Sequence, residues 1–205
     1  MEKLDLKKTL KALYAPSAKE PSLVDVPPMN CFAVDGQGAP GAQAFQEAIE
    51  ALYGASYTLK FMLKKRKGFP EYAVMPLEGL WCADDVTAFV EGRKDECKWT
   101  LLIVQPDFIT RELFDEAVAE LKAKKDSPAI AKLRFDTLRE GQSVQIMHVG
   151  PYAAEKPTIE RLHAYMKEKG CTFNGPHHEV YMNDPRRTAP EKLKTIIRQP
   201  VRSSC

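Results

Sequence analysis

Three residues near the end of the chain stand at alternate positions, and two of them, a glutamate and a tyrosine, have side chains that can do chemistry together. In the stretch GPHHEVYMNDPRR, residues 175–187, the residues His177, Glu179 and Tyr181 would share one face of an extended strand. A carboxylate among aromatic rings can attract a cation or act as a general base on a bound water. An isolated strand glutamate is more often simply solvated, so this face is either a wet sheet surface or the wall of a site. The opposite face has the composition of a core and carries His178, Val180 and Met182.

The composition is that of an ordinary globular protein and removes several classes of function. The chain has 205 residues, of which 44% are hydrophobic and 28% charged, and its formal net charge is +2. Because acidic residues nearly balance the basic ones, we expect no nucleic-acid partner. The two short basic clusters, KKRK at 64–67 and PRRTAPEK at 185–192, are typical of a solvated helix end or loop.

Cysteine use and the charged N-terminus favour a cytoplasmic protein without a metal. The five cysteines are an odd number with no C-x-x-C spacing, which favours reduced thiols over a disulfide framework. The HHE triplet at 177–179 lacks the H-E-x-x-H spacing of a zinc site. No apolar run approaches the roughly 18 residues that cross a bilayer, and residues 1–14 are too charged for a signal peptide. We therefore expect no membrane association, no metal and no cofactor, while the oligomeric state stays open.

Two parts of the chain show the same order of expected elements: strand, glycine turn, helix, strand, strand. The first begins at Asn30 and passes through EYAVMPLEGLW and KWTLLIVQP, and the second begins at Gln142 and passes through HHEVYMNDP and KLKTIIRQPV. A glycine closes each first strand, at Gly36 and Gly150. This repetition predicts a duplicated module within one domain, 1–205, with a first repeat at 22–106, a helical insert at 107–138 and a second repeat at 139–202.

Apolar periodicity places a helix in each repeat and two in the insert. The first repeat has a long helix after Pro40, with a break near Gly54 as one alternative, and its apolar stripe is Phe45, Ile49, Leu52, Tyr53, Leu59 and Leu63. In the second repeat Pro157 opens and Gly170 closes a shorter helix. The insert has one helix capped by Thr110 and a second that starts at 127–128. Residues 1–23 indicate a peripheral helix followed by a loop.

These elements predict an α+β fold in which two antiparallel sheets are related by a pseudo-twofold axis. The helices would pack on one face of the sheets, and a central ligand cleft would run along the axis, because ligand sites favour clefts between units. The site would then lie on the sheet faces that do not carry the helices.

The run IMHVGPYAAEKPTIERLHAYMKEKG, followed by PHHEVYMNDPRRTAPEKLKTIIRQPV, resembles the second half of the GyrI-like small-molecule-binding family, named for a bacterial gyrase inhibitor. The peptide PLEGLW, preceded by KGFPEYAVM, is similar to the first half of a free-standing branch of that family, so the resemblance covers about 22–202. It implies a central pocket for small, often aromatic or cationic compounds. Some free-standing members are similar to hydrolases that open strained cyclopropane rings, while regulator members carry a helix-turn-helix, which nothing here resembles.

The resemblance also implies roles for particular residues. Glu179 matches the buried glutamate that contacts the ligand in multidrug-sensing relatives, and Tyr152 matches a family tyrosine. These two are the candidate catalytic residues, with Glu179 as general base and Tyr152 or Tyr181 assisting. Trp81 and Tyr181 are candidate ligand-binding residues on which a planar compound would stack.

Two further candidate ligand-binding residues have structural alternatives. Glu78 in PLEGLW either contacts ligand or shapes its turn, and His148 is either a site residue or a hydrogen-bonded sheet histidine. Glu155 is better explained by the start of the following helix, whose dipole favours a negative charge. The function is therefore hydrolysis of electrophilic small molecules, non-catalytic drug binding or sequestration, or a gyrase-inhibitor-like interaction.

Overall fold

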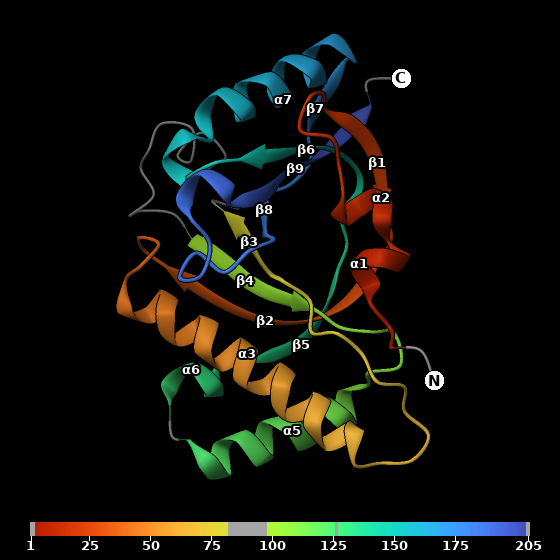
Figure 1. Ribbon diagram of the computed structural model, residues 1–205, viewed down its shortest axis with the longest axis vertical. Helices are drawn as coiled ribbons and strands as arrows, with labels where there is room; N and C mark the ends of the chain where they lie inside the picture. The colour runs from red at the N-terminus through yellow and green to blue at the C-terminus, as the bar shows by residue number, and fades with distance from the viewer. Residues whose placement is uncertain (1–2, 82–97, 126, 204–205) are drawn as a thin grey trace.

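The protein is described by a computed structural model that covers residues 3–81, 98–125 and 127–203. Its strands form one strongly curled, antiparallel, nine-stranded sheet with the order β1-β6-β9-β8-β3-β4-β2-β5, and β7 pairs with β9 (Figure 1). The strands are β1 (Ser22–Val26), β2 (Met29–Gln37), β3 (Leu77–Trp81), β4 (Lys98–Val104), β5 (Arg134–Leu138), β6 (Gly141–Val149), β7 (Cys171–Phe173), β8 (His177–Tyr181) and β9 (Lys194–Ser203).

The described helical segments differ greatly in length. They are α1 (Leu6–Thr9), α2 (Lys11–Tyr14), α3 (Gln43–Lys64), α5 (Arg111–Lys124), α6 (Pro128–Ala131) and α7 (Lys156–Glu168), with the 3₁₀ turns η1 (Tyr152–Ala154) and η2 (Pro190–Lys192). Helix α3 packs on β2 and β4 and also carries α5 and α6, whereas α7 packs on β6 and β9. In Figure 1, α7 lies above the curled sheet and α3 and α5 lie below it.

The α+β class is confirmed, but the expectation of two separate sheets is wrong. Strands β3 and β8, one from each half of the chain, pair antiparallel and join the halves into a single sheet. Outward from this pair the order is β3-β4-β2 on one side and β8-β9-β6 on the other. The first half follows the predicted strand, helix, strand, strand order, as β2, α3, β3 and β4, whereas in the second half β7 lies between α7 and the predicted strands β8 and β9. The pairing of β3 with β8 removes two edges that would otherwise be exposed.

Helix α3 runs without a break through Gly54, so the predicted alternative of an interruption there is wrong. A Cβ at Gly54 would lie 3.2 Å from a methyl carbon of Leu121 on α5. The glycine therefore serves close packing of two helices rather than a helix end. Along the same helix Leu52 and Leu59 are fully buried, as the apolar stripe predicted.

Other predicted ends agree with the structure. The Thr110 hydroxyl accepts a hydrogen bond from the amide of Leu113 and caps α5, and α6 begins at Pro128. Strands β1, β5 and β7 were not indicated by periodicity; β5 falls within the segment that we expected to be helical. Residues 5–14 form two single turns, α1 and α2, in place of one peripheral helix.

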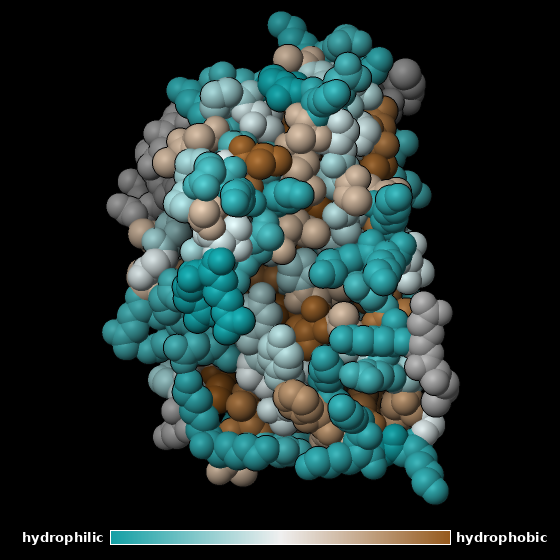
Figure 2. Space-filling model, in the orientation of Figure 1, coloured by the Kyte–Doolittle hydropathy of each residue, from teal (hydrophilic) through white to brown (hydrophobic). Residues whose placement is uncertain are grey.

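The described surface gives no sign of a bilayer-spanning segment. None of the helices within residues 3–81, 98–125 and 127–203 combines the length and the apolar character needed to cross a membrane. On the face shown in Figure 2, hydrophobic residues occur in small separate areas among hydrophilic ones. Scattered apolar residues of this kind are normal on a folded domain.

Candidate functional site

Glu179 is buried in the centre of the sheet. It lies on β8, its residue exposure is 4%, and it faces Gly79 of β3 on one side and Ile197 of β9 on the other. The Tyr181 hydroxyl donates a hydrogen bond to Glu179 Oε2 at 2.7 Å, which shows that both side chains project to the same face. Of the two interpretations of this strand face, the wet sheet surface is therefore wrong.

A tryptophan from the first half of the chain completes a short hydrogen-bond chain. Trp81 Nε1 donates to Tyr181 Oη at 3.0 Å, across the β3–β8 pair. A Cβ at Gly79 would lie 2.9 Å from Trp81 Nε1 and 3.1 Å from Tyr181 Oη. Because Gly79 has no side chain, the Trp81 indole and the Tyr181 hydroxyl can form their hydrogen bond directly over this residue.

The site face is the face that carries the helices, which corrects our expectation that it would be the other one. Phe45 of α3 stacks on Trp81 with ring centroids 5.7 Å apart. The register of the paired strands places Trp81, Glu179 and His148 on the same face of the sheet. On β6, His148 of this face contacts Thr158 of α7. Glu179 therefore lies on the part of the sheet between α3 and α7.

Tyr152 follows β6 and borders the same region. Its ring meets that of Tyr181 edge to face at a centroid distance of 5.8 Å, and its exposed fraction is 36%. Burial, followed by the charges of Glu155 and Glu179, raises the pKa of Tyr152 to about 12. Burial and the Glu179 carboxylate likewise raise the pKa of Tyr181 well above its usual value. Both phenols therefore remain hydrogen-bond donors at neutral pH.

Two buried acid–base residues beside Tyr152 and Glu179 were not assigned to the site from sequence. Glu155 is 3% exposed at the start of α7, and its side chain makes no helix-capping hydrogen bond. His177 is 4% exposed, with Nε2 3.4 Å from Glu179 Oε1. The alternation that placed His177 on the face of Glu179 was the available signal for the histidine. For Glu155, the helix-start interpretation did not suggest a position near Tyr152, where its charge contributes to the raised pKa of that phenol.

His148 is better explained as a hydrogen-bonded sheet histidine than as a residue that contacts ligand. Its Nδ1 lies 2.9 Å from Thr158 Oγ1, and its Nε2 lies 3.3 Å from the carbonyl oxygen of Pro151. Both ring nitrogens thus have protein partners, and the ring is only 5% exposed. These contacts connect β6 to α7 and to the turn that leads into Tyr152.

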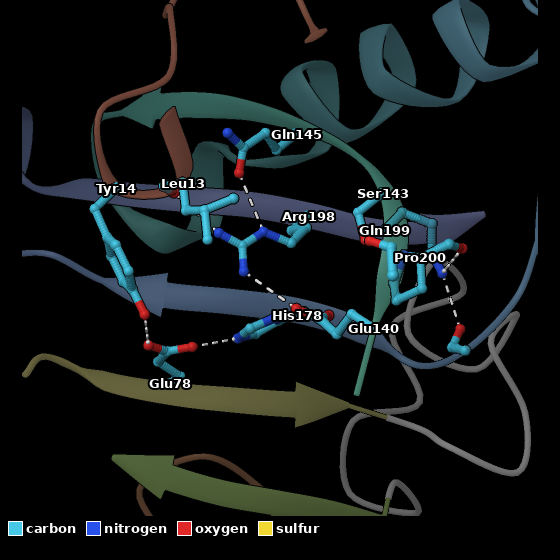
Figure 3. A network of polar contacts seen from close by, with 12 residues as sticks. Leu13, Tyr14, Glu78, Glu140, Ser143, Gln145, His178, Arg198, Gln199 and Pro200 are labelled. Carbon is cyan, nitrogen blue, oxygen red and sulfur yellow. Dashed lines mark hydrogen bonds and ion pairs between the residues drawn. The ribbon is translucent and has the colours of Figure 1, made fainter. Parts of the chain in front are cut away.

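Glu78 lies on the opposite face of the sheet, away from Glu179, so its assignment to the same ligand site is wrong. It is fully buried and belongs to a network with Tyr14, His178, Glu140 and Arg198 (Figure 3). Tyr14 Oη donates to Glu78 Oε1 at 2.9 Å, and Glu78 Oε2 lies 3.0 Å from His178 Nε2. On the far side of the imidazole, His178 Nδ1 lies 2.9 Å from Glu140 Oε1. Glu140 Oε2 in turn accepts from Arg198 Nη1 at 3.1 Å.

The charges in this network support one another. The neighbouring carboxylates of Glu140 and Glu78 outweigh the opposing effect of burial and raise the pKa of His178 to about 9. His178 and Arg198 likewise outweigh burial at Glu140, whose pKa they lower to about 2. The network combines two acidic groups, Glu78 and Glu140, with two basic groups, His178 and Arg198, so their formal charges balance. Removing one member of such a buried network would leave a buried charge without compensation and would destabilise the fold.

These two pKa shifts predict a stability optimum in mildly acidic solution. The pKa of His178 is raised from 6.5, so its contribution is complete below pH 6.5 and is lost as the pH rises through about 9. The pKa of Glu140 is lowered from 4.5, so its contribution is complete above pH 4.5 and is lost as the pH falls toward 2. Urea unfolding at a series of pH values should show the free energy falling on both sides of this window. The alkaline decline should weaken in His178→Gln, and an unchanged decline would contradict the assignment.

Comparison with known proteins assigns the family. A model of the GyrI-like small molecule binding domain matches residues 19–202. The chain belongs to the GyrI-like family. Its domain is accordingly a small-molecule binding domain, and the resemblance to this family is confirmed.

Several solved structures are similar to this GyrI-like chain. An uncharacterized conserved protein from Listeria innocua is 36% identical, with 98% of this chain and 100% of that chain covered and a TM-score of 0.88. A hydrolase from Listeria innocua has the same identity and coverage and the same TM-score of 0.88. The EcmrR C-terminal domain is 12% identical with a TM-score of 0.60, covering 90% of this chain and 98% of that chain, and shares the fold alone. No curated protein sequence matches the chain.

Proposed function

We propose that this GyrI-like protein hydrolyses an electrophilic small molecule, with Glu179 as the general base. The observation that carries the proposal is the buried Glu179 carboxylate, held by the Tyr181 hydroxyl on the strand pair between α3 and α7. The hydrolase from Listeria innocua, 36% identical over almost the whole chain, supports the same class of activity. Because Glu179 is only 4% exposed, a ligand reaches it after rearrangement of the side chains around it.

The substrate class is a cyclopropane conjugated to a carbonyl group. Glu179 takes a proton from water while the water oxygen bonds to a ring carbon, and the ring C–C bond breaks. The electron pair of that bond moves to the carbonyl oxygen, which gains negative charge. A Tyr152 phenol, protonated at neutral pH, can donate a hydrogen bond to this oxygen. The proton then returns from the Glu179 carboxyl group to the product, so one water is added overall.

Turnover of a cyclopropane fused to a dienone tests the proposal directly. Incubation with the protein followed by mass spectrometry should give the ring-opened product, heavier than the substrate by one water. Boiled protein supplies the background rate. Recovery of unchanged substrate at the background rate would contradict hydrolysis.

Binding of aromatic cations without turnover is a second candidate function. The aromatic rings of Tyr152, Tyr181 and Trp81 cluster near the Glu179 carboxylate, a combination that favours a planar cation. Calorimetry with N-methylquinolinium and with neutral methylquinoline separates charge from shape. Tighter binding of the cation that disappears in Glu179→Gln would support this function, whereas equal affinity for both compounds would contradict it.

A further inference from the structure

The strand pair that carries Glu179 is cross-linked on both of its faces. On the face with the helices, Trp81 and Tyr181 bridge β3 and β8 by a hydrogen bond. On the opposite face, His178 of β8 lies 3.0 Å from Glu78 of β3. The register sets Leu80 opposite His178 and Val180 opposite Glu78, so the ion pair runs diagonally across the two strands. Each cross-link joins the same two strands at the junction of the two halves of the chain.

The opposite-face cross-link is anchored in the rest of the fold. His178 also contacts Glu140, at the turn before β6, and Arg198 stands opposite His178 on β9. Arg198 Nη2 donates to the carbonyl oxygen of Leu13 at 2.9 Å, and Tyr14 holds Glu78 from the same N-terminal segment. Figure 3 shows Glu78 and Glu140 on either side of the His178 imidazole, with Tyr14 directed at Glu78 and Arg198 at Glu140. The position of His178 is thus defined from several directions at once.

Because the groups of this network are charged and buried, they must keep short distances to their partners. His178, Glu78 and Arg198 are all fully buried, and charges removed from water are stable only at contact distance from their partners. The nearby Cys31 thiol stays neutral, because burial raises its pKa to about 12. A shift of β8 against β3 would therefore lengthen the His178–Glu78 contact, and it would also disturb the backbone pairing of the two strands.

We propose that the His178–Glu78 ion pair is a positioning device that holds β8 against β3, so that Tyr181 remains between Trp81 and Glu179. Chain connectivity supports this, since Glu179 directly follows His178 and Gly79 directly follows Glu78. Displacements of about 1 Å at a reacting group can cost about 100-fold in rate. The inference rests on the proposed role of Glu179 for its functional meaning, but its geometry can be measured without a ligand.

Nuclear magnetic resonance of the tryptophan indole groups tests the inference. The chain has two tryptophans, and the Trp99 indole, which donates to the carbonyl oxygen of Gly38 at 3.2 Å, provides an internal reference. Tyr181→Phe removes the acceptor of Trp81 and so identifies the Trp81 signal. In the unmodified protein, we expect this signal to move toward its Tyr181→Phe position as His178 loses its proton near pH 9, while the Trp99 signal stays fixed.

Variants give an independent measurement at neutral pH. Glu78→Gln should displace the Trp81 signal in the same direction, and it should lower the pH at which His178 titrates. Ile130→Ala, in α6 and buried, is the matched control that loses core packing without touching the strand pair, so its Trp81 signal should not move. If Glu78→Gln does not fold, the pH titration of the unmodified protein decides.

A Trp81 signal that stays in place while His178 titrates would overturn the inference, as would an unmoved signal in folded Glu78→Gln. Failure of the proposed function has a different signature. If Glu179→Gln leaves turnover and cation binding unchanged, Glu179 has no role in either, yet a Trp81 signal coupled to His178 would still establish the positioning effect.

Discussion

Replacement of Glu179 by glutamine is expected to lower kcat on an activated cyclopropane by about 100- to 10,000-fold, the usual range for a general base. The amide has nearly the size of the carboxylate and can still accept the Tyr181 hydrogen bond, which now measures 2.7 Å. It cannot take a proton from water at neutral pH. The loss should therefore fall on kcat, with KM and Tm changed little.

Glu191→Gln is the matched control for this experiment. Glu191 lies in η2, is exposed, and undergoes the same chemical change at a distance from the proposed base. We expect its kcat to equal that of the unmodified protein. Equal turnover by Glu179→Gln and the unmodified protein would remove the general-base role.

Replacement of Arg198 by methionine is expected to lower the free energy of unfolding by about 3–5 kcal/mol, the usual cost of breaking a buried ion pair from one side. Arg198 is fully buried and donates to Glu140, to Gln145 and to the carbonyl oxygen of Leu13 at 3.1, 3.1 and 2.9 Å. Its removal leaves two carboxylates, Glu78 and Glu140, with His178 as the one remaining cation of the network. Urea unfolding measures the loss.

Two further variants separate charge from packing. Glu140→Gln combined with Arg198→Met restores the neutrality of the network, so part of the lost stability should return. Arg134→Met is the surface control, because Arg134 pairs with Asp35 and Asp136 in exposed positions and should lose no more than about 1 kcal/mol. A loss in Arg198→Met that is as small as in Arg134→Met would contradict a structural role for the network. If Arg198→Met does not fold, Arg198→Lys keeps the charge and loses the Gln145 and Leu13 contacts.

Local pattern was sufficient to predict most of the individual elements. The apolar stripe of α3, the Thr110 cap of α5 and the strand β8 all depend on neighbours within a few residues, and all agree with the structure. The number of sheets was not predictable in the same way. It depends on the pairing of β3 with β8, between residues about a hundred positions apart, and strand periodicity carries no information about partners.

The candidate site, too, was predicted correctly where local pattern decides and wrongly where strand pairing decides. Alternation correctly grouped Glu179 with Tyr181, and the family resemblance added Trp81 and Tyr152, which the structure brings into the same region. Glu78 was misplaced because a one-residue difference in strand register sends a side chain to the other face.

The sequence did not reveal the network around Glu78 at all. Its members Tyr14, Glu140 and Arg198 come from distant segments, and each looks like an ordinary surface residue in its own stretch. Only the three-dimensional arrangement shows that they are buried together.

A crystal structure of the Glu179→Gln variant soaked with an activated cyclopropane tests the location of the site most directly. The predicted result is ligand density against residue 179, in contact with Tyr152 or Tyr181, between α3 and α7. Density found only elsewhere would contradict the account, for example in the groove of about 390 Å³ that is lined by Tyr57 and Phe61 of α3.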